Sequence, residues 1–269
     1  MSLIHQLSLL AATTLALAVP AAAAQPVPED ARKELAPTGT LRAAINLGNG
    51  VLAQKDETTG EPKGVTPDLA RELGKRLGVP VQLVVYEAAG KVFDAAAKNE
   101  WDIAFVAIEP VRASVIEFTA PYVLIEGVYA VTKESPIKSL ADVDKAGNRI
   151  AVGLKSAYDL FLSRTIKNAT IVRAATGGSR AMIDLFRAEK LEVVAGVRQP
   201  LTDYVKDHAD MRLIDEPFMQ IEQAMGTPKG RLAGVAYLRG FVEEMKASGF
   251  VADALKRSGQ SAAVAPAAK

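Results

Sequence analysis

The sequence predicts an α/β fold made of two lobes with a cleft between them. Two observations lead to this prediction. Apolar segments of strand length alternate with amphipathic segments of helix length, and the alternation occurs twice, before and after a long apolar strand at residues 122–132. Strands that alternate with helices form mostly parallel sheets covered by helices. A chain of 269 residues, 49% of them hydrophobic, is long enough to bury the cores of two such lobes.

The first alternating set predicts strands at residues 40–47, 79–86 and 101–108, and helices at 66–78 and 88–100. The helix at 66–78 has the clearest boundaries, because Thr66 can cap its start and Gly78 can end it. Within this helix Leu69, Leu73 and Leu77 recur every four residues, which indicates one buried stripe.

The second set predicts strands at residues 148–154, 169–174, 191–197 and 211–215, and helices at 156–167, 179–190 and 199–208. A further strand at 220–230 and helices at 231–248 and 250–259 follow. The helix at 231–248 can belong to either lobe on its periodicity alone.

The two ends of the chain lack this alternation. Residues 7–24 form an apolar stretch that Pro20 breaks and that ends in alanines, which predicts a cleaved signal peptide over residues 1–24. The segment before it has no Lys or Arg, and a retained membrane anchor is the alternative. Residues 25–37 are polar and proline-rich and are expected to be a flexible leader, and residues 259–269 a disordered tail.

Composition excludes several classes of function. The formal net charge is +1 with charges of both signs interspersed, which argues against a nucleic-acid-binding surface. The chain has no cysteine, which excludes disulfides and thiolate metal sites. Its only histidines, His5 and His208, argue against a histidine metal cluster or a Ser-His-Asp triad, so we expect no cofactor.

Three blocks carry a family likeness: TGTLRAAINL, GVTPDLARELGKRLGVPVQLVVY and EWDIAFVAIEPVRASVIEFTAPY. In this order they resemble the extracytoplasmic solute-binding proteins of ABC importers, and most of all the amino-acid-binding branch, family 3. The likeness extends from about residue 38 to residue 259. The residues that match the family's motifs are Gly64, Asp68, Leu69, Asp102, Pro110, Arg112, Phe118, Pro121 and Tyr122.

The resemblance implies a type II periplasmic binding protein fold, with two Rossmann-like lobes, a central cleft and two hinge strands. It places residues 38–130 and 216–258 in lobe 1 and residues 131–215 in lobe 2. The segments IEGVYAV and MQIEQAM are expected at the hinge.

The resemblance also assigns Arg112 the task of gripping a ligand carboxylate. A guanidinium offers paired donors at the spacing of two carboxylate oxygens. The alternative for Arg112 is a salt bridge to Glu109 or Glu117 that ties down the loop. Ala107, at the end of the preceding strand, belongs to the same candidate site.

In the second lobe, the family's turn at a helix start corresponds to VGLKSAYDLF. Ser156 keeps a hydroxyl there, as a plain helix cap or also as a ligand contact, and Lys155 adds a cation that is either solvated or directed at the ligand. Further candidates are Asn46 and Asn49 after the first strand, whose other role is to form the turn. Tyr86 and Tyr158 are candidate stacking partners, or else rim or core residues; Tyr86 is the one we include in the site.

Two positions depart from the family pattern. Val197 occupies the place where amino-acid binders have an aspartate for the ligand ammonium, although Glu192 keeps the first acidic position of that motif. Glu109 replaces the usual Thr or Ser, and either neutralises Arg112 or faces a ligand cation. Arg198 beside Val197 can make the second lobe cationic, which favours an acidic ligand without an amine.

The function expected from the resemblance is that of a periplasmic, non-enzymatic binding component of an ABC importer. It would capture a small anionic or zwitterionic solute by hinge closure, and deliver it as a monomer to a permease in the inner membrane. One alternative is a periplasmic dehydratase on the same fold, with Glu109 as general acid. Another is a binding protein that presents its ligand to a separate receptor.

Overall fold

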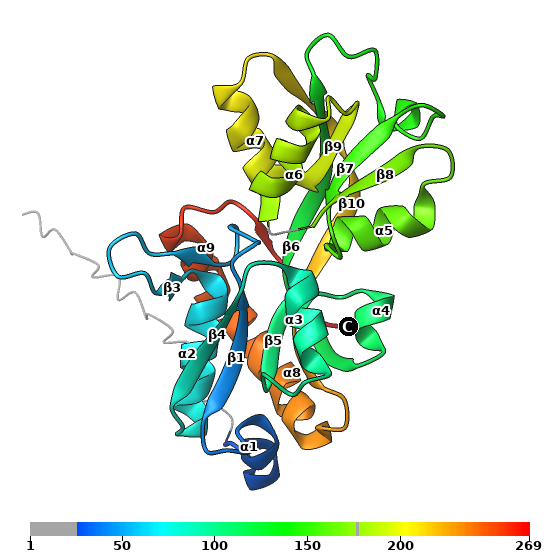
Figure 1. Cartoon of the computed structure of the whole chain (residues 1–269). Coiled ribbons are helices and arrows are strands. Elements are labelled where there is room, and N and C mark those ends of the chain that lie inside the picture. Colours follow the sequence, from blue (N-terminus) through cyan, green and yellow to red (C-terminus); the bar gives the residue numbers. More distant parts are fainter. Residues whose placement is uncertain (1–25, 176–177) are drawn as a thin grey trace, which may run out of the picture.

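The computed structural model describes residues 26–175 and 178–269. Figure 1 shows two lobes, one above the other, with two long strands passing between them. These strands are β6 (Ile116–Thr132) and β10 (Met211–Pro228). The two-lobed α/β architecture predicted from the sequence is therefore confirmed.

The first lobe, lower in Figure 1, contains three parallel strands with β1 (Leu41–Asn46) in the middle, between β4 (Val81–Tyr86) and β5 (Ile103–Ala107). In α2 of this lobe, Leu69, Leu73 and Leu77 are buried as predicted, and Gly78 ends the helix in the left-handed region at φ 66°. The lobe's helices are α2 (Val65–Leu77), α3 (Ala89–Ala96), α4 (Pro110–Ala113), α8 (Leu232–Ala247) and α9 (Phe250–Arg257), beside a hairpin of β2 (Gln54–Lys55) and β3 (Pro62–Lys63).

The second lobe repeats this arrangement, with β7 (Arg149–Gly153) between the parallel strands β8 (Thr170–Ala174) and β9 (Val193–Val197). Its helices are α5 (Ala157–Thr165), α6 (Gly178–Ala188) and α7 (Arg198–Asp207), with a short 3₁₀ helix, η1 (Leu140–Asp142), before β7. In both lobes the predicted strands and helices are present, with ends that differ by a few residues.

The strands β6 and β10 join the two lobes into one sheet of order β4-β1-β5-β10-β6-β9-β7-β8. In the first lobe β10 pairs with β5 through Gln223–Gly226, and in the second β6 pairs with β9 through Gly127–Ala130. Because β6 has joined the second lobe's sheet by Gly127, the crossing lies near Glu126, earlier than the boundary predicted after residue 130.

The strands predicted separately at residues 211–215 and 220–230 are one strand, β10. Its register against β6 shifts between Ile214 and Met219. A bulge of this kind bends a strand without ending its pairing, which a sequence pattern cannot distinguish from two strands.

The leader predicted to be flexible contains a helix, α1 (Glu29–Leu35), so that prediction is wrong for these residues. Ala31 and Leu35 lie on one side of α1 and are fully buried against α8. The contact is fixed by Glu34, whose Oε2 accepts the backbone N–H of Gly234 at 2.7 Å. Burial of two apolar residues on the first lobe explains why this short segment is ordered.

The tail predicted to be disordered is also ordered in part, as β11 (Ala263–Val264), which pairs with Val123 and Leu124 of β6. The N–H of Ala265 donates to the carbonyl of Tyr122 at 3.1 Å, and Ala265 is buried. Pairing with β6, which lies far away in sequence, therefore orders part of a terminus whose small residues suggested disorder.

The predicted signal peptide at residues 1–24 lies outside the described residues. Within the ranges 26–175 and 178–269, no helix has both the length and the apolar character needed to cross a membrane.

Candidate functional site

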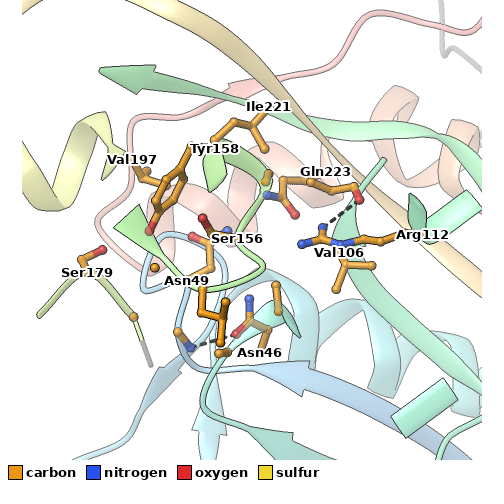
Figure 2. Close-up of a pocket in the computed structure, with 18 of the residues that line it drawn as sticks. Asn46, Asn49, Val106, Arg112, Ser156, Tyr158, Ser179, Val197, Ile221 and Gln223 are labelled. Carbon is orange, nitrogen blue, oxygen red and sulfur yellow. Dashed lines mark hydrogen bonds between the residues drawn. The ribbon is translucent and has the colours of Figure 1, made fainter. Parts of the chain in front are cut away.

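A cavity of about 70 Å³ lies between the two lobes, where the strands β1, β5, β7 and β9 end. Ligands in open α/β sheets bind at the carboxyl ends of strands, so this is the expected position for a site. Figure 2 shows Arg112 and Gln223 on the side of the cavity opposite Val197 and Tyr158. The polar residues that line it are Asn46, Asn49, Arg112, Ser156, Tyr158, Ser179 and Gln223.

Arg112 is the charged residue of the cavity wall. It lies on the short helix α4, which Pro110 begins directly after β5, and it is only 1% exposed. Its Nη1 donates to the carbonyl of Ala107 at 2.9 Å, and its Nη2 donates to the carbonyl of Lys155 at 3.0 Å. The buried Nε has no partner within the described part of the chain. The guanidinium is thus oriented by two bonds and retains free N–H donors.

The charge of Arg112 is poorly compensated. Burial lowers the pKa of its guanidinium to about 10, and the nearby charge of Glu109 opposes that shift. The group is still protonated at neutral pH. A buried cation with an unpaired N–H is the chemistry of a site that receives an anion.

Around the cavity, three contacts between described residues join one lobe to the other. The first is the bond from Arg112 to the Lys155 carbonyl. The second is the ion pair of Lys155 Nζ with Asp94 of α3 at 2.7 Å. The third joins Glu109 Oε2 and Nη1 of Arg164 on α5, also at 2.7 Å, although its geometry is not that of a hydrogen bond. The lobes are therefore closed on each other.

The remaining polar groups of the wall are neutral. The Oδ1 of Asn46 accepts the N–H of Gly48 at 3.0 Å, whereas the buried Oδ1 of Asn49 has no partner among the described residues. Ser156 is the N-cap of α5, because its Oγ accepts the N–H of Asp159 at 3.0 Å. The hydroxyl of Tyr158 points to the sulfur of Met182 at 3.2 Å.

The structure brings together most of the residues predicted from the sequence. Arg112 and Ala107, with Asn46, Asn49 and Ser156, line the same cavity. Tyr158 and Val197 complete that wall from the second lobe. Arg112 has no ion pair with Glu109 or Glu117 within the described residues; Glu117 lies near Arg239, at 3.7 Å.

Four predicted site residues lie elsewhere. The carboxylate of Glu109 faces Arg164, and the ammonium of Lys155 faces Asp94. Arg198 turns to Glu126 and the carbonyl of Asp215, beside the crossing strands. These three charges are drawn away from the cavity by opposite charges that the sequence pattern could not place. The fourth, Tyr86, donates its hydroxyl to Glu100 at 3.0 Å.

Two residues of the wall escaped the sequence interpretation. Gln223 comes from β10 and is 6% exposed, and Ser179 comes from the start of α6. The signal for Gln223 was a polar residue in the predicted hinge segment MQIEQAM, and the signal for Ser179 was a hydroxyl directly after two glycines. Glu192, the acidic residue that fits the family motif, lies at the far end of β9 and pairs with Arg149 at 2.9 Å.

No group of three or more His, Asp or Glu side chains suited to a metal ion occurs in the ranges 26–175 and 178–269.

Comparisons with known proteins identify the fold that holds this cavity. The cysteine-binding protein from Campylobacter jejuni has a TM-score of 0.72 at 21% identity, over 84% of this chain and 92% of that chain. A variant of ArgBP from T. maritima has a TM-score of 0.71 at 20% identity, over 85% of this chain and 99% of that chain. The ancestral amino acid-binding protein AncCDT-1, described as a precursor of cyclohexadienyl dehydratase, has a TM-score of 0.69 at 22% identity, over 84% and 98%.

Identities this low show the shared fold, which is that of type II periplasmic binding proteins. No curated sequence shows significant similarity to the chain. The sequence profile of the bacterial extracellular solute-binding proteins, family 3, matches residues 52–260. Since this match covers well over half of the chain, the protein belongs to the bacterial extracellular solute-binding proteins, family 3.

Proposed function

We propose that the protein is the periplasmic binding component of an ABC importer and that it captures a small carboxylate-bearing solute in the cavity between its lobes. The observation that carries this proposal is Arg112, a residue of the cavity wall whose guanidinium is buried and whose Nε–H has no partner in the described structure. Membership of the solute-binding family supports the binding role.

Arg112 suits a carboxylate for two reasons. Its planar fork presents parallel N–H donors that match two carboxylate oxygens, and the bonds to Ala107 and Lys155 fix the direction of that fork. A carboxylate would also neutralise a charge that burial now disfavours.

Closure of the lobes is the step that couples capture to delivery. Arg112 touches the second lobe through the Lys155 carbonyl, so a ligand held by Arg112 lies where the two lobes meet. A ligand that contacts both lobes stabilises the closed arrangement over an open one, because it gains those contacts only on closure. The closed monomer is the form that a permease in the inner membrane would recognise.

Among the described residues, the cavity wall does not contain the general acid that the dehydratase alternative requires. Glu109, the general acid required by the dehydratase alternative, is not part of the cavity wall and pairs with Arg164. Arg112 is therefore assigned to binding, without a catalytic step.

The test is the binding of small carboxylic acids and amino acids to the mature chain, residues 25–269, measured by thermal shift and calorimetry with wild type and Arg112→Ala. We expect Arg112→Ala to weaken binding by at least about 30-fold, since removal of one partner from a buried charge pair costs about 2–5 kcal/mol. Arg257→Ala is the matched control, because Arg257 is exposed and pairs with Asp68 on the surface of the first lobe.

Circular dichroism of the unliganded variants checks that each one folds. Arg112→Lys, which keeps the charge but not the fork, should bind more weakly than wild type and more tightly than Arg112→Ala. If Arg112→Ala binds the same acids as tightly as wild type, the assignment of Arg112 is wrong.

A further inference from the structure

We propose that the solute is a monoanionic carboxylic acid without an ammonium group, whose other polar groups are neutral. This inference rests on the proposed function and narrows its ligand from carboxylates in general to those that carry no amine.

The charge of the cavity wall is the first argument. Among the described residues that line the cavity, Arg112 is charged and no Asp or Glu is present. One guanidinium can neutralise one carboxylate. An α-ammonium beside that carboxylate would lose its water on closure and would meet no opposite charge.

Three carboxylates that lie close to the lobe contacts around the cavity are already paired with cations. Glu109 pairs with Arg164, and Asp94 pairs with Lys155. Asp159 accepts the Lys155 N–H at 2.7 Å and pairs with Arg173 at 2.9 Å. To reach an ammonium in the cavity, any of them would have to abandon a cationic partner.

The helix N-termini around the cavity also favour an anion. Four helices of eight residues or more, α3, α5, α6 and α7, begin at the cavity, and residues from each start lie in its wall: Ala89, Ser156, Gly178 and Val197. The N-terminus of a helix carries a partial positive charge. Four such ends beside a buried guanidinium with an unpaired Nε–H favour an anion and oppose an ammonium.

The neutral part of the wall indicates what else the ligand carries. The buried Oδ1 of Asn49 is an acceptor without a partner in the described structure, so it fits a donor such as a hydroxyl. Val106, Ile221 and Val197 provide apolar surface. This combination suits an organic acid with a short carbon chain better than an inorganic oxyanion.

The experiment compares acids that differ only at the amine. Wild type is titrated with L-alanine, L-lactate and pyruvate, and with L-phenylalanine, 3-phenyllactate and phenylpyruvate, with sulfate and phosphate as inorganic controls. We expect at least one hydroxy or oxo acid to bind about tenfold or more tightly than its amino acid. An amino acid that binds as tightly as its amine-free counterparts overturns this inference and leaves carboxylate capture standing.

The other outcomes are equally decisive. If sulfate or phosphate binds more tightly than every organic acid, the ligand class is wrong. If no carboxylate binds, with or without an amine, the proposed function itself fails.

A substitution in the cavity wall tests the same point from the protein's side. Val197 lines the cavity and is the N-cap of α7, a position where both Asp and Asn are favoured, so Val197→Asp and Val197→Asn are both compatible with the fold. Val197→Asp should shift the ratio of amino acid to hydroxy acid affinity by about tenfold toward the amino acid, and neutral Val197→Asn should not. An unchanged ratio in Val197→Asp would overturn the argument that a missing carboxylate excludes the ammonium.

Discussion

In each lobe, an arginine at or next to the start of the central strand binds a carboxylate that lies just before the lobe's third strand. In the first lobe Arg42 donates from its backbone N–H and its side chain to Asp102, at 2.8–3.0 Å. In the second lobe Arg149 does the same to Glu192, at 2.9 Å for each of the three bonds. The two lobes thus share one structural device at the ends of their strands that face away from the cavity.

The lobes differ in how far this device is buried and in what lies at the cavity. Asp102 is fully buried and accepts hydrogen bonds from a second arginine, Arg231 at the N-cap of α8, whereas the side chain of Glu192 is 34% exposed. At the cavity, the first lobe provides Arg112, while the second provides neutral groups and helix starts. A shared lobe architecture therefore does not give the two lobes equal roles in the proposed function: one would carry the ligand's counter-charge, and the other would close over it.

The largest effect on stability should appear when Asp102, the buried carboxylate of the first lobe, is removed. We expect Asp102→Asn to lower the free energy of unfolding by about 3–5 kcal/mol, because it leaves the charges of Arg42 and Arg231 without their partner. Urea denaturation followed by circular dichroism measures this change. If Asp102→Asn lowers the free energy of unfolding by less than about 1 kcal/mol, burial does not make the Arg42–Asp102 pair more stabilising than an exposed pair.

The second largest effect is expected on ligand affinity, where the two lobes meet at the cavity. A Cβ on Gly90 of α3 would lie 2.7 Å from the Cβ of Lys155 in the second lobe, so Gly90→Ala should hold the lobes apart. We expect carboxylate affinity to fall about 5- to 150-fold, while the unliganded protein keeps its thermal stability because Ala favours helix α3.

Gly50→Ala is the control for this experiment, since a Cβ at Gly50 meets nothing within 4 Å and its φ is not positive. Calorimetry with the tightest-binding acid gives both affinities. Equal affinities for Gly90→Ala and wild type would show that the lobes adjust without losing the closed form.

The smallest effect on stability is expected at the partly exposed Arg149–Glu192 pair of the second lobe. The Arg149 guanidinium holds the pKa of Glu192 below its ordinary value of 4.5. The stability that this pair contributes is therefore present above about pH 4.5 and is lost as the pH falls below that value. We expect Glu192→Gln to cost less than about 1 kcal/mol at pH 7, because the pair is partly exposed.

Urea denaturation of wild type and Glu192→Gln at several pH values measures this difference. The two proteins should become equally stable at acidic pH. A difference that persists at low pH would mean that Glu192 stabilises the lobe by packing rather than by charge.

Much of the fold could be predicted, because its signals are local. The helix at 66–78 carries its own apolar stripe and terminating glycine, and those features formed α2 as expected. The predicted cap is wrong, because Gly64 is the N-cap of α2 and the Thr66 hydroxyl, inside the helix, donates to the carbonyl of Leu52. The α1 and β11 segments could not be predicted, since each is ordered by contacts with residues far away in sequence. For α1 these are Arg231 and Gly234, and for β11 they are Val123 and Leu124.

In the candidate site, only the residues whose positions follow from the backbone topology could be predicted from the sequence. Asn46 ends β1, and Arg112 and Ser156 follow the ends of β5 and β7, so the topology alone brings them together. The directions of long charged side chains depend on partners across the cleft or the hinge, as with Lys155 and Arg198. Sequence order does not show those partners, so charge near a motif was a poor guide to charge in the cavity.

The C-terminal segment gives the protein a natural position for an optical reporter. β11 pairs with β6 in the first lobe just before the crossing, and Ser261 donates its hydroxyl to Gln199 of α7 in the second lobe at 3.1 Å. Ala262 lies in a surface groove together with Gln199 and Arg198. Since the chain contains no cysteine of its own, Ala262→Cys offers a single thiol for a dye that touches both lobes, and its emission then follows the angle between them in real time.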